Sequence, residues 1–250
     1  MALKGGVDYE SDRLTSEYLH FHYAARSDFF PWGEAGVQFL SYAQRVVSER
    51  FPKLATGRGL DVGCAVGRSA FEMARSCREV VGIDYSRRFI ERAKALQNSG
   101  ACRYHMAFQG EMAREFVAEV PEGIDRKRVD FLVGDAHALP TDIGVFDWVL
   151  GANLICRLRS PRDFLAQLPD LVVKGGILVL NSPFTWMEEH TQFDEWLGGR
   201  STGPRSEEVL KEILDPNFEL IDETSMPFMI RETERKYQLT FAHSGKWRRR

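Results

Sequence analysis

The sequence is poor in the residue patterns that build cross-linked, metal-binding or membrane proteins. Its 250 residues include four cysteines, scattered and without C-x-x-C spacing, which predicts reduced thiols and no disulfide framework. The six histidines form no metal-ligand motif, so we expect no metal cofactor. We expect no secretory leader, and no apolar run approaches the length of a membrane span. These absences predict a reduced, cytoplasmic protein that contacts no membrane.

An excess of charge of either sign is also lacking. Thirty-three basic residues against 36 acidic ones give a net charge of −3, so nucleic acid is not expected as a partner. The basic run at residues 246–250 is interpreted as a solvated chain end. A chain of this length buries roughly three quarters of its unfolded surface, enough for one large core. With no internal repeat or long linker, residues 1–250 are predicted to form a single domain.

The most informative motif is a glycine-bent turn at residues 59–69, which read Gly-Leu-Asp-Val-Gly-Cys-Ala-Val-Gly-Arg-Ser. It follows an apolar run, and a second apolar run over residues 80–84 ends on Asp84. In α/β folds the backbone of such a turn approaches a ligand, and an acid about 20 residues later accepts both ribose hydroxyls. The pattern therefore predicts the nucleotide-binding half of a doubly wound α/β fold. A tight strand-to-helix turn without a ligand is the alternative.

The spacing within the turn argues against a dinucleotide. A G-x-G-x-x-G turn is interrupted here by Ala65 and Arg68, which disfavours a nicotinamide oxidoreductase. With Gly63, Gly67 and Asp61, the turn instead resembles the D-x-G-x-G-x-G turn of class I methyltransferases, which passes under S-adenosyl-L-methionine. Ala65 replaces the middle glycine, and a methyl group should be tolerated there if φ is negative.

Three further strand ends follow in the order of that fold. Residues 129–133 lead to Asp135 and Ala136, which in class I methyltransferases meet the adenine amino group and ring. Residues 145–150 lead to Asn153, and a fifth strand follows the double glycine at 175–176. The resemblance implies an α/β, Rossmann-like class I methyltransferase fold. Such a fold has a seven-stranded, mostly parallel sheet, a C-terminal antiparallel hairpin, N-terminal helices and, here, an insertion before the third strand.

Additional segments surround this sheet. Residues 1–56 are predicted to form a helical cap, with one helix capped by Ser11 or Asp12 and a second near residues 37–51. Residues 97–128 are an insertion arm with turns at 109–111 and 121–123. Residues 183–205 follow the fifth strand, where a substrate pocket needs walls. The chain ends in two predicted strands, 218–225 and 236–243, joined by a ten-residue connection.

The resemblance extends to a narrower family, the methyltransferase of ovothiol biosynthesis. It is carried by segments outside the cofactor frame: 9–12, 17–23, 121–126, 152–158, 182–186 and 227–238. It implies N-methylation of the imidazole of 5-thiohistidine (4-mercaptohistidine), giving ovothiol A and S-adenosyl-L-homocysteine. The family domain is often fused behind an iron-dependent sulfoxide synthase. Because no iron-binding histidine cluster is present, we expect a stand-alone transferase acting after a separate synthase, or an excised domain.

Candidate site residues follow from the motif positions. Cofactor binding is assigned to Tyr23, Asp61, Gly63, Cys64, Ala65, Gly67, Asp84, Tyr85, Asp135, Ala136 and Asn153. A zwitterionic amino acid needs a cation at its carboxylate, best an arginine. Substrate positioning is assigned to Asn153, Arg157 and Tyr237, and substrate binding to Arg231, Trp186, Tyr9 and His22. For these substrate residues, ion pairing, loop bracing or core packing is the alternative.

The predicted chemistry is attack of a ring nitrogen on the sulfonium methyl group, with the cofactor supplying the activated group. The thiolate of this substrate is a better nucleophile than its ring nitrogen, so the site must hold the sulfur away by geometry. Two other functions stay open at this point. One is methylation of a different small molecule, and the other is a catalytically idle domain that binds S-adenosylmethionine.

Overall fold

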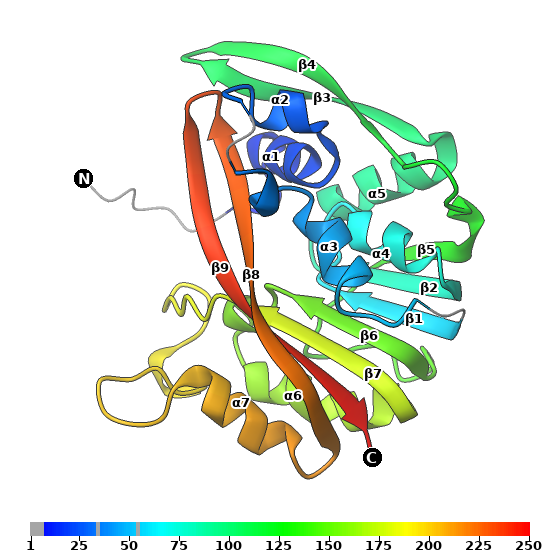
Figure 1. Cartoon of the computed structure of the whole chain (residues 1–250), viewed down its shortest axis with the longest axis vertical. Helices are drawn as coiled ribbons and strands as arrows, with labels where there is room; N and C mark the ends of the chain where they lie inside the picture. Colours follow the sequence, from blue (N-terminus) through cyan, green and yellow to red (C-terminus); the bar gives the residue numbers. More distant parts are fainter. Residues whose placement is uncertain (1–7, 34–35, 54–55) are drawn as a thin grey trace.

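The computed structural model describes residues 8–33, 36–53 and 56–250. Within these ranges no helix is both long and apolar enough to cross a membrane. Seven strands form one sheet in the order β5-β2-β1-β6-β7-β9-β8 (Figure 1). The strands are β1 (Thr56–Val62), β2 (Cys77–Asp84), β5 (Val129–Val133), β6 (Phe146–Ala152), β7 (Val172–Ser182), β8 (Phe218–Thr233) and β9 (Lys236–Arg249). The first five are parallel and the last two antiparallel, which confirms the predicted Rossmann-like fold.

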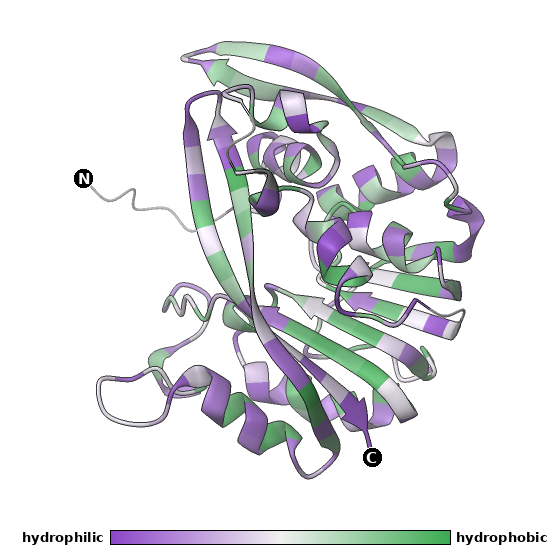
Figure 2. Cartoon of the chain, in the orientation of Figure 1, coloured by the Kyte–Doolittle hydropathy of each residue, from purple (hydrophilic) through white to green (hydrophobic). Residues whose placement is uncertain are grey.

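Helices cover both faces of this sheet. On one face lie α4 (Arg68–Met73) and α5 (Arg87–Ser99), and on the other α6 (Pro161–Leu171) and α7 (Ser206–Leu214). Successive strand residues point to opposite faces, so Val80 joins the first core cluster and Val81 the second. Figure 2 shows the resulting hydrophobic stretches along the central strands, as expected for a sheet buried on both faces.

The N-terminal region forms α1 (Asp12–Tyr23), α2 (Arg26–Phe29), the short 3₁₀ helix η1 (Val37–Phe39) and α3 (Tyr42–Ser48). The predicted cap at Ser11 is confirmed, because its Oγ accepts the N–H of Leu14 at 3.2 Å. The single helix predicted near 37–51 is wrong. It is divided into η1 and α3 at Ser41, whose φ of 54° is left-handed. The first seven residues of the predicted cap lie outside the described residues.

The insertion arm is a separate antiparallel hairpin of β3 (Ala101–Gln109) and β4 (Met112–Glu119), which turns at Gly110 within the predicted 109–111 turn. Inward-facing residues of this hairpin pack against α1, and His20 Nδ1 lies 3.0 Å from the hydroxyl of Tyr104. In Figure 1 α1 is enclosed between this arm and the β8–β9 hairpin, and both contact it.

The C-terminal hairpin is longer than the sequence predicts. Only Glu234 and Arg235 separate β8 from β9, so the predicted ten-residue connection is wrong. The predicted solvated end is correct only in part: Arg248 and Arg250 are exposed, but residues 246–249 belong to β9, Trp247 is buried against β7, and Arg249 donates to the carbonyl of Pro169. The parallel strands bring their carboxyl ends to one edge of the sheet. This edge is where doubly wound folds bind ligands.

Candidate functional site

The glycine-rich loop after β1 is anchored to the end of β2. The N–H groups of Gly63 and Cys64 both donate to the carbonyl of Ile83, at 2.8 and 3.0 Å. Gly67 closes the loop with a φ of 84°, and a Cβ on it would lie 2.5 Å from the ring of Phe131. Gly67 is therefore required by backbone conformation and by packing, whatever ligand the loop meets.

The condition of a negative φ at Ala65 is not met, because its φ is 48°. A left-handed conformation costs an L-residue about 1–2 kcal/mol. The compensating contact is the Ala65 N–H, which donates to Oδ2 of Asp84 at 2.9 Å. The turn therefore holds a strained residue so that its backbone faces the acid at the end of β2.

Asp84 lies at the edge of the sheet with both carboxylate oxygens oriented by backbone. Oδ2 accepts from Ala65, and Oδ1 accepts the N–H of Ser86 at 2.9 Å. Burial raises the pKa of Asp84 to about 6, although these N–H donors oppose the rise. Each oxygen keeps a lone pair for a further donor, such as a ribose hydroxyl. The neighbouring Tyr85 is 77% exposed.

Asp61 and Cys64 lie beneath the loop. Asp61 is buried, and its Oδ2 accepts the hydroxyl of Ser69 at 2.6 Å at the start of α4. Burial raises its pKa to about 7. The Cys64 Sγ is buried beside the carbonyl of Ala65, at 3.7 Å. Both side chains support the loop from below, so any effect on a ligand would pass through the loop backbone.

The acid that follows β5 is held by a histidine two residues later. Oδ1 of Asp135 accepts a hydrogen bond from the backbone N–H of His137 at 2.9 Å. The same oxygen lies 2.6 Å from Nδ1 of the His137 ring. Burial would raise the pKa of Asp135, but these two donors outweigh it and the pKa is lowered. Ala136, between them, is buried. A carboxylate is therefore present at this strand end.

Asn153 ends β6 in the left-handed region, with a φ of 55°. This conformation suits asparagine better than most residues. Its Oδ1 accepts the hydroxyl of Tyr42 at 3.3 Å, and that hydroxyl also accepts the amide of the buried Asn181 at 3.0 Å. Asn153 is thus oriented by α3 and β7 together.

Helix α1 lies across this edge and is attached at both ends. The carbonyl of Tyr9, just before the helix, accepts the hydroxyl of Ser86 at 3.0 Å, and the hydroxyl of Tyr23 donates to Val66 at 2.9 Å. Between these contacts, His22 presents a buried Nδ1 that has no partner among the described residues. Burial, aided by the charge of Arg68, lowers the pKa of His22 to about 3, so the ring is neutral at pH 7.

Next to this edge, Arg157 brings together the end of β6, the segment 183–205 and the residues that precede α1. It lies in η3 (Ile155–Arg157) after β6 and donates to the carbonyls of Cys156 and Thr185 at 3.1 and 3.0 Å. Burial raises the pKa of Tyr9 while the Arg157 charge opposes the rise. Burial lowers the pKa of His190, and Arg157 lowers it further. The rings of Tyr9 and His190 are 6.4 Å apart.

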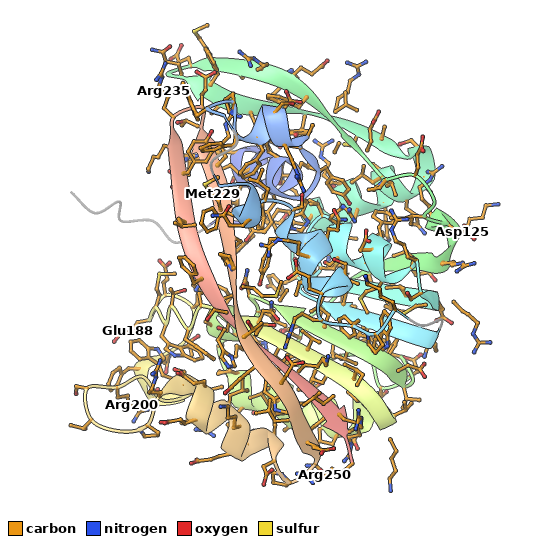
Figure 3. All side chains as sticks on the ribbon, in the orientation of Figure 1. Asp125, Glu188, Arg200, Met229, Arg235 and Arg250 are labelled. Atoms are coloured by element: carbon orange, nitrogen blue, oxygen red, sulfur yellow. The ribbon has the colours of Figure 1, made fainter. Side chains whose placement is uncertain are left out.

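Two predicted substrate residues lie elsewhere. Arg231 is 2% exposed, and it donates to the carbonyls of Asp28 and Thr233 near the tip of the β8–β9 hairpin. The hydroxyl of Tyr237 donates to the carbonyl of Phe29 at 3.1 Å. Figure 3 shows Arg235, at this tip, well separated from Glu188 in the 183–205 segment. The side chains of Arg231 and Tyr237 therefore hold the hairpin against α2.

Trp186 braces the segment after β7. Its indole N–H donates to Ser206 at 2.9 Å, and its ring stacks with Trp196. The segment 183–205 is therefore attached to the start of α7. Sequence reasoning missed His137, His190 and Tyr42 as site residues. Only His137 carried a local signal, since an acid two residues earlier commonly accepts a backbone N–H.

The donor and acceptor set fits S-adenosylmethionine. Asp84 would accept the ribose hydroxyls, Asp135 would accept the adenine amino group, and the unpartnered Nδ1 of His22 lies beside the loop that would face the amino-acid end. Within the described ranges, no group of three or more His, Cys, Asp or Glu side chains is arranged to hold a metal ion.

Comparison with known proteins agrees with this geometry. Residues 60–180 match the family model described as a methyltransferase domain. The solved N-methyltransferase NodS from Bradyrhizobium japonicum, in complex with S-adenosyl-L-homocysteine, superposes with a TM-score of 0.52 at 18% identity, covering 94% of this chain and 98% of that one. The chain has the α/β, Rossmann-like fold of class I S-adenosylmethionine-dependent methyltransferases. Its fold is one that binds S-adenosylmethionine.

Curated relatives match this chain over part of their own length. Ajmaline N-methyltransferase of Rauvolfia serpentina is 25% identical over 211 residues, 81% of this chain and 61% of that protein. A tRNA U34 carboxymethyltransferase of Vibrio cholerae is 29% identical over 133 residues, 53% of this chain and 34% of that protein. The chain thus spans less than two thirds of the length of each of these relatives.

Proposed function

We propose that this methyltransferase domain transfers a methyl group from S-adenosylmethionine to an imidazole nitrogen of 5-thiohistidine. The proposal is supported by the segments that resemble the ovothiol methyltransferase, which include the strand end at Asn153 and Arg157. Ajmaline N-methyltransferase, a relative along most of the chain, carries out N-methylation of another compound. The acceptor is therefore proposed to be a small molecule with a nucleophilic nitrogen.

The observation that carries the proposal is the convergence of Arg157, Tyr9 and His190 beside the edge that holds Asp84. A guanidinium recognises a carboxylate with two parallel hydrogen bonds. Tyr9 keeps its proton because burial raises its pKa, so it is a donor at neutral pH. Burial lowers the pKa of His190, so its ring is neutral at pH 7, and its buried Nε2 makes no hydrogen bond among the described residues, although Oε1 of Glu189 lies 3.4 Å away.

These groups supply what a thiohistidine requires. When bound, S-adenosylmethionine supplies an activated methyl group. Arg157 would hold the acceptor's carboxylate, and the hydroxyl of Tyr9 would donate to its sulfur and keep that sulfur turned away. His190 would accept the ring N–H that does not react. Fixing one orientation in this way is a proximity effect worth several kcal/mol, about 7 or more at best.

The test is a product assay with the purified chain, S-adenosylmethionine and a panel of 5-thiohistidine, histidine and other imidazoles. We expect N-methylthiohistidine and S-adenosylhomocysteine in equal amounts, with far lower kcat/KM for histidine. S-methyl product at comparable yield would contradict the proposed orientation. Turnover of another panel member in preference to thiohistidine would replace the proposed acceptor.

A second candidate, methylation of a different small molecule, is favoured by one observation. Arg157 already donates to two backbone carbonyls and lies 3.4 Å from the hydroxyl of Thr185, as a loop brace would. An acceptor without a carboxylate would need no free guanidinium. The same panel separates the two candidates, because only the thiohistidine site would discriminate against imidazoles that lack a carboxylate.

A further inference from the structure

His137 connects the acid after β5 to the loop before α6. Its Nδ1 lies 2.6 Å from Oδ1 of Asp135, and its Nε2 lies 3.2 Å from the backbone nitrogen of Ser160. The Ser160 hydroxyl in turn donates to Glu195 at 3.1 Å, in the 183–205 segment. The side chain of His137 is 17% exposed and that of Asp135 is 35% exposed, so the carboxylate is the partner nearer to solvent.

The Ser160 contact determines which ring nitrogen of His137 carries the proton. A backbone N–H only donates, so Nε2 must be the acceptor. The ring proton of the neutral imidazole is then on Nδ1, where it is donated to Asp135. Two donors from one residue, the backbone N–H and Nδ1–H, therefore hold Oδ1 of Asp135.

We propose that His137 is a positioning residue for recognition of the adenine base. By occupying Oδ1, it fixes the carboxylate plane and leaves Oδ2 to accept the exocyclic amino group. The charged group nearest to Oδ2 among the described residues is Arg159, at 4.0 Å with its side chain 82% exposed, so Oδ2 is not held by a tight ion pair. The preference of this site for a purine with an amino group over one with a keto group then depends on the His137 tautomer, which the Ser160 N–H determines.

This inference rests on the assignment of Asp135 to the adenine end of the cofactor. It does not depend on the methyl acceptor. The experiment measures, by calorimetry, dissociation constants for S-adenosylhomocysteine and for its deaminated analogue S-inosylhomocysteine, which presents a carbonyl in place of the amino group. Their ratio is the discrimination. No turnover is needed.

Two nearly isosteric variants separate the two roles of the ring. In His137→Asn the amide nitrogen takes the place of Nδ1 and keeps the donor to Asp135. In His137→Gln the amide oxygen takes the place of Nε2 and keeps only the Ser160 contact. A charge-assisted hydrogen bond corresponds to about 10- to 100-fold in affinity, so we expect at least about 10-fold discrimination in the natural chain. His137→Asn should retain it, and His137→Gln should lose most of it.

Arg159→Gln serves as the control that removes the nearby charge, and it should leave the ratio unchanged. Equal discrimination in the two His137 variants would overturn the proposal, because a residue that only supports the loop would affect both ligands alike. If Asp135→Asn binds S-adenosylhomocysteine with unchanged discrimination, the adenine assignment fails and this inference fails with it. Neither result bears on thiohistidine methylation, which the product assay tests separately. Thermal unfolding confirms that each variant is folded, and His137→Gln compared with the natural chain decides the question even if His137→Asn fails to fold.

Discussion

Replacement of Asp84 by asparagine tests the cofactor site most sharply. The carboxylate accepts the N–H groups of Ala65 and Ser86, each at 2.9 Å, and lies where the ribose hydroxyls would donate. Asparagine has the same shape and keeps one carbonyl oxygen, but it has no charge and presents a donor at the other position. The loop therefore keeps most of its support while the ligand loses a charged acceptor.

The magnitude follows from these contacts. A hydrogen bond to a charged group contributes about 1.5–3 kcal/mol, so weakening two of them should cost about 3 kcal/mol or more of binding free energy. This corresponds to a loss of S-adenosylhomocysteine affinity of roughly 150-fold. The effect on folding is smaller, because burial of the ionised carboxylate is itself unfavourable, as the raised pKa of about 6 indicates.

Calorimetric titration with S-adenosylhomocysteine measures this effect, with the exposed Asp142→Asn as a matched control that should bind normally. The natural chain should also bind more weakly as the pH falls below about 6, because protonated Asp84 accepts fewer hydrogen bonds. Asp84→Asn should abolish that pH dependence. An unchanged dissociation constant for folded Asp84→Asn would show that Asp84 does not contact the cofactor.

Three further predictions concern the loop, its buried acid and the acceptor. Gly67→Ala should lower the free energy of unfolding in urea by at least about 2 kcal/mol, because the added Cβ meets the ring of Phe131. Gly110→Ala, also at positive φ but in open space, should lower it by only about 1 kcal/mol. Equal losses in the two variants would mean that backbone strain alone acts. Burial raises the pKa of Asp61 to about 7, so its contribution to stability is complete below its ordinary pKa of 3.8 and is lost as the pH rises through 7. Urea titrations from pH 4 to 8 should show this decline reduced in Asp61→Asn, and an identical slope would contradict the assignment. Arg157→Gln should lower kcat/KM for thiohistidine by about 10- to 100-fold with unchanged S-adenosylhomocysteine affinity; the same loss with a thioimidazole that lacks a carboxylate would indicate a loop brace.

The sheet and its ligand edge were predictable because their signals are local. An apolar run that ends in Gly63, or on Asp84, is read within a few residues, and the parallel order of such strands follows from the fold they resemble. The hairpin was predicted too short, and Pro227 lies within the part of β8 that was taken for a connection. Proline is tolerated in β8 because β8 is the edge strand of the sheet and has β9 as its one neighbour. On its other side no strand would need the N–H group that proline lacks.

The substrate side was less predictable for a physical reason. Arg231 and Tyr237 carry the right chemistry, but their polar atoms are used by the carbonyls of Asp28 and Phe29, more than 200 positions away in the chain. In the same way, Arg157 meets Tyr9 and His190 only through tertiary packing. Spacing in a sequence cannot report contacts of this kind. The positive φ of Ala65 was missed because alanine rarely adopts it.

The proposed reaction is methylation of a ring nitrogen of 5-thiohistidine. The most direct measurement is heteronuclear NMR of the product formed from 5-thiohistidine and S-adenosylmethionine that carries a ¹³C-labelled methyl group. We expect a single labelled methyl signal coupled to the imidazole ring through nitrogen, with no S-methyl signal. A labelled methyl on sulfur, or no transfer by a chain that still binds S-adenosylhomocysteine, would contradict it.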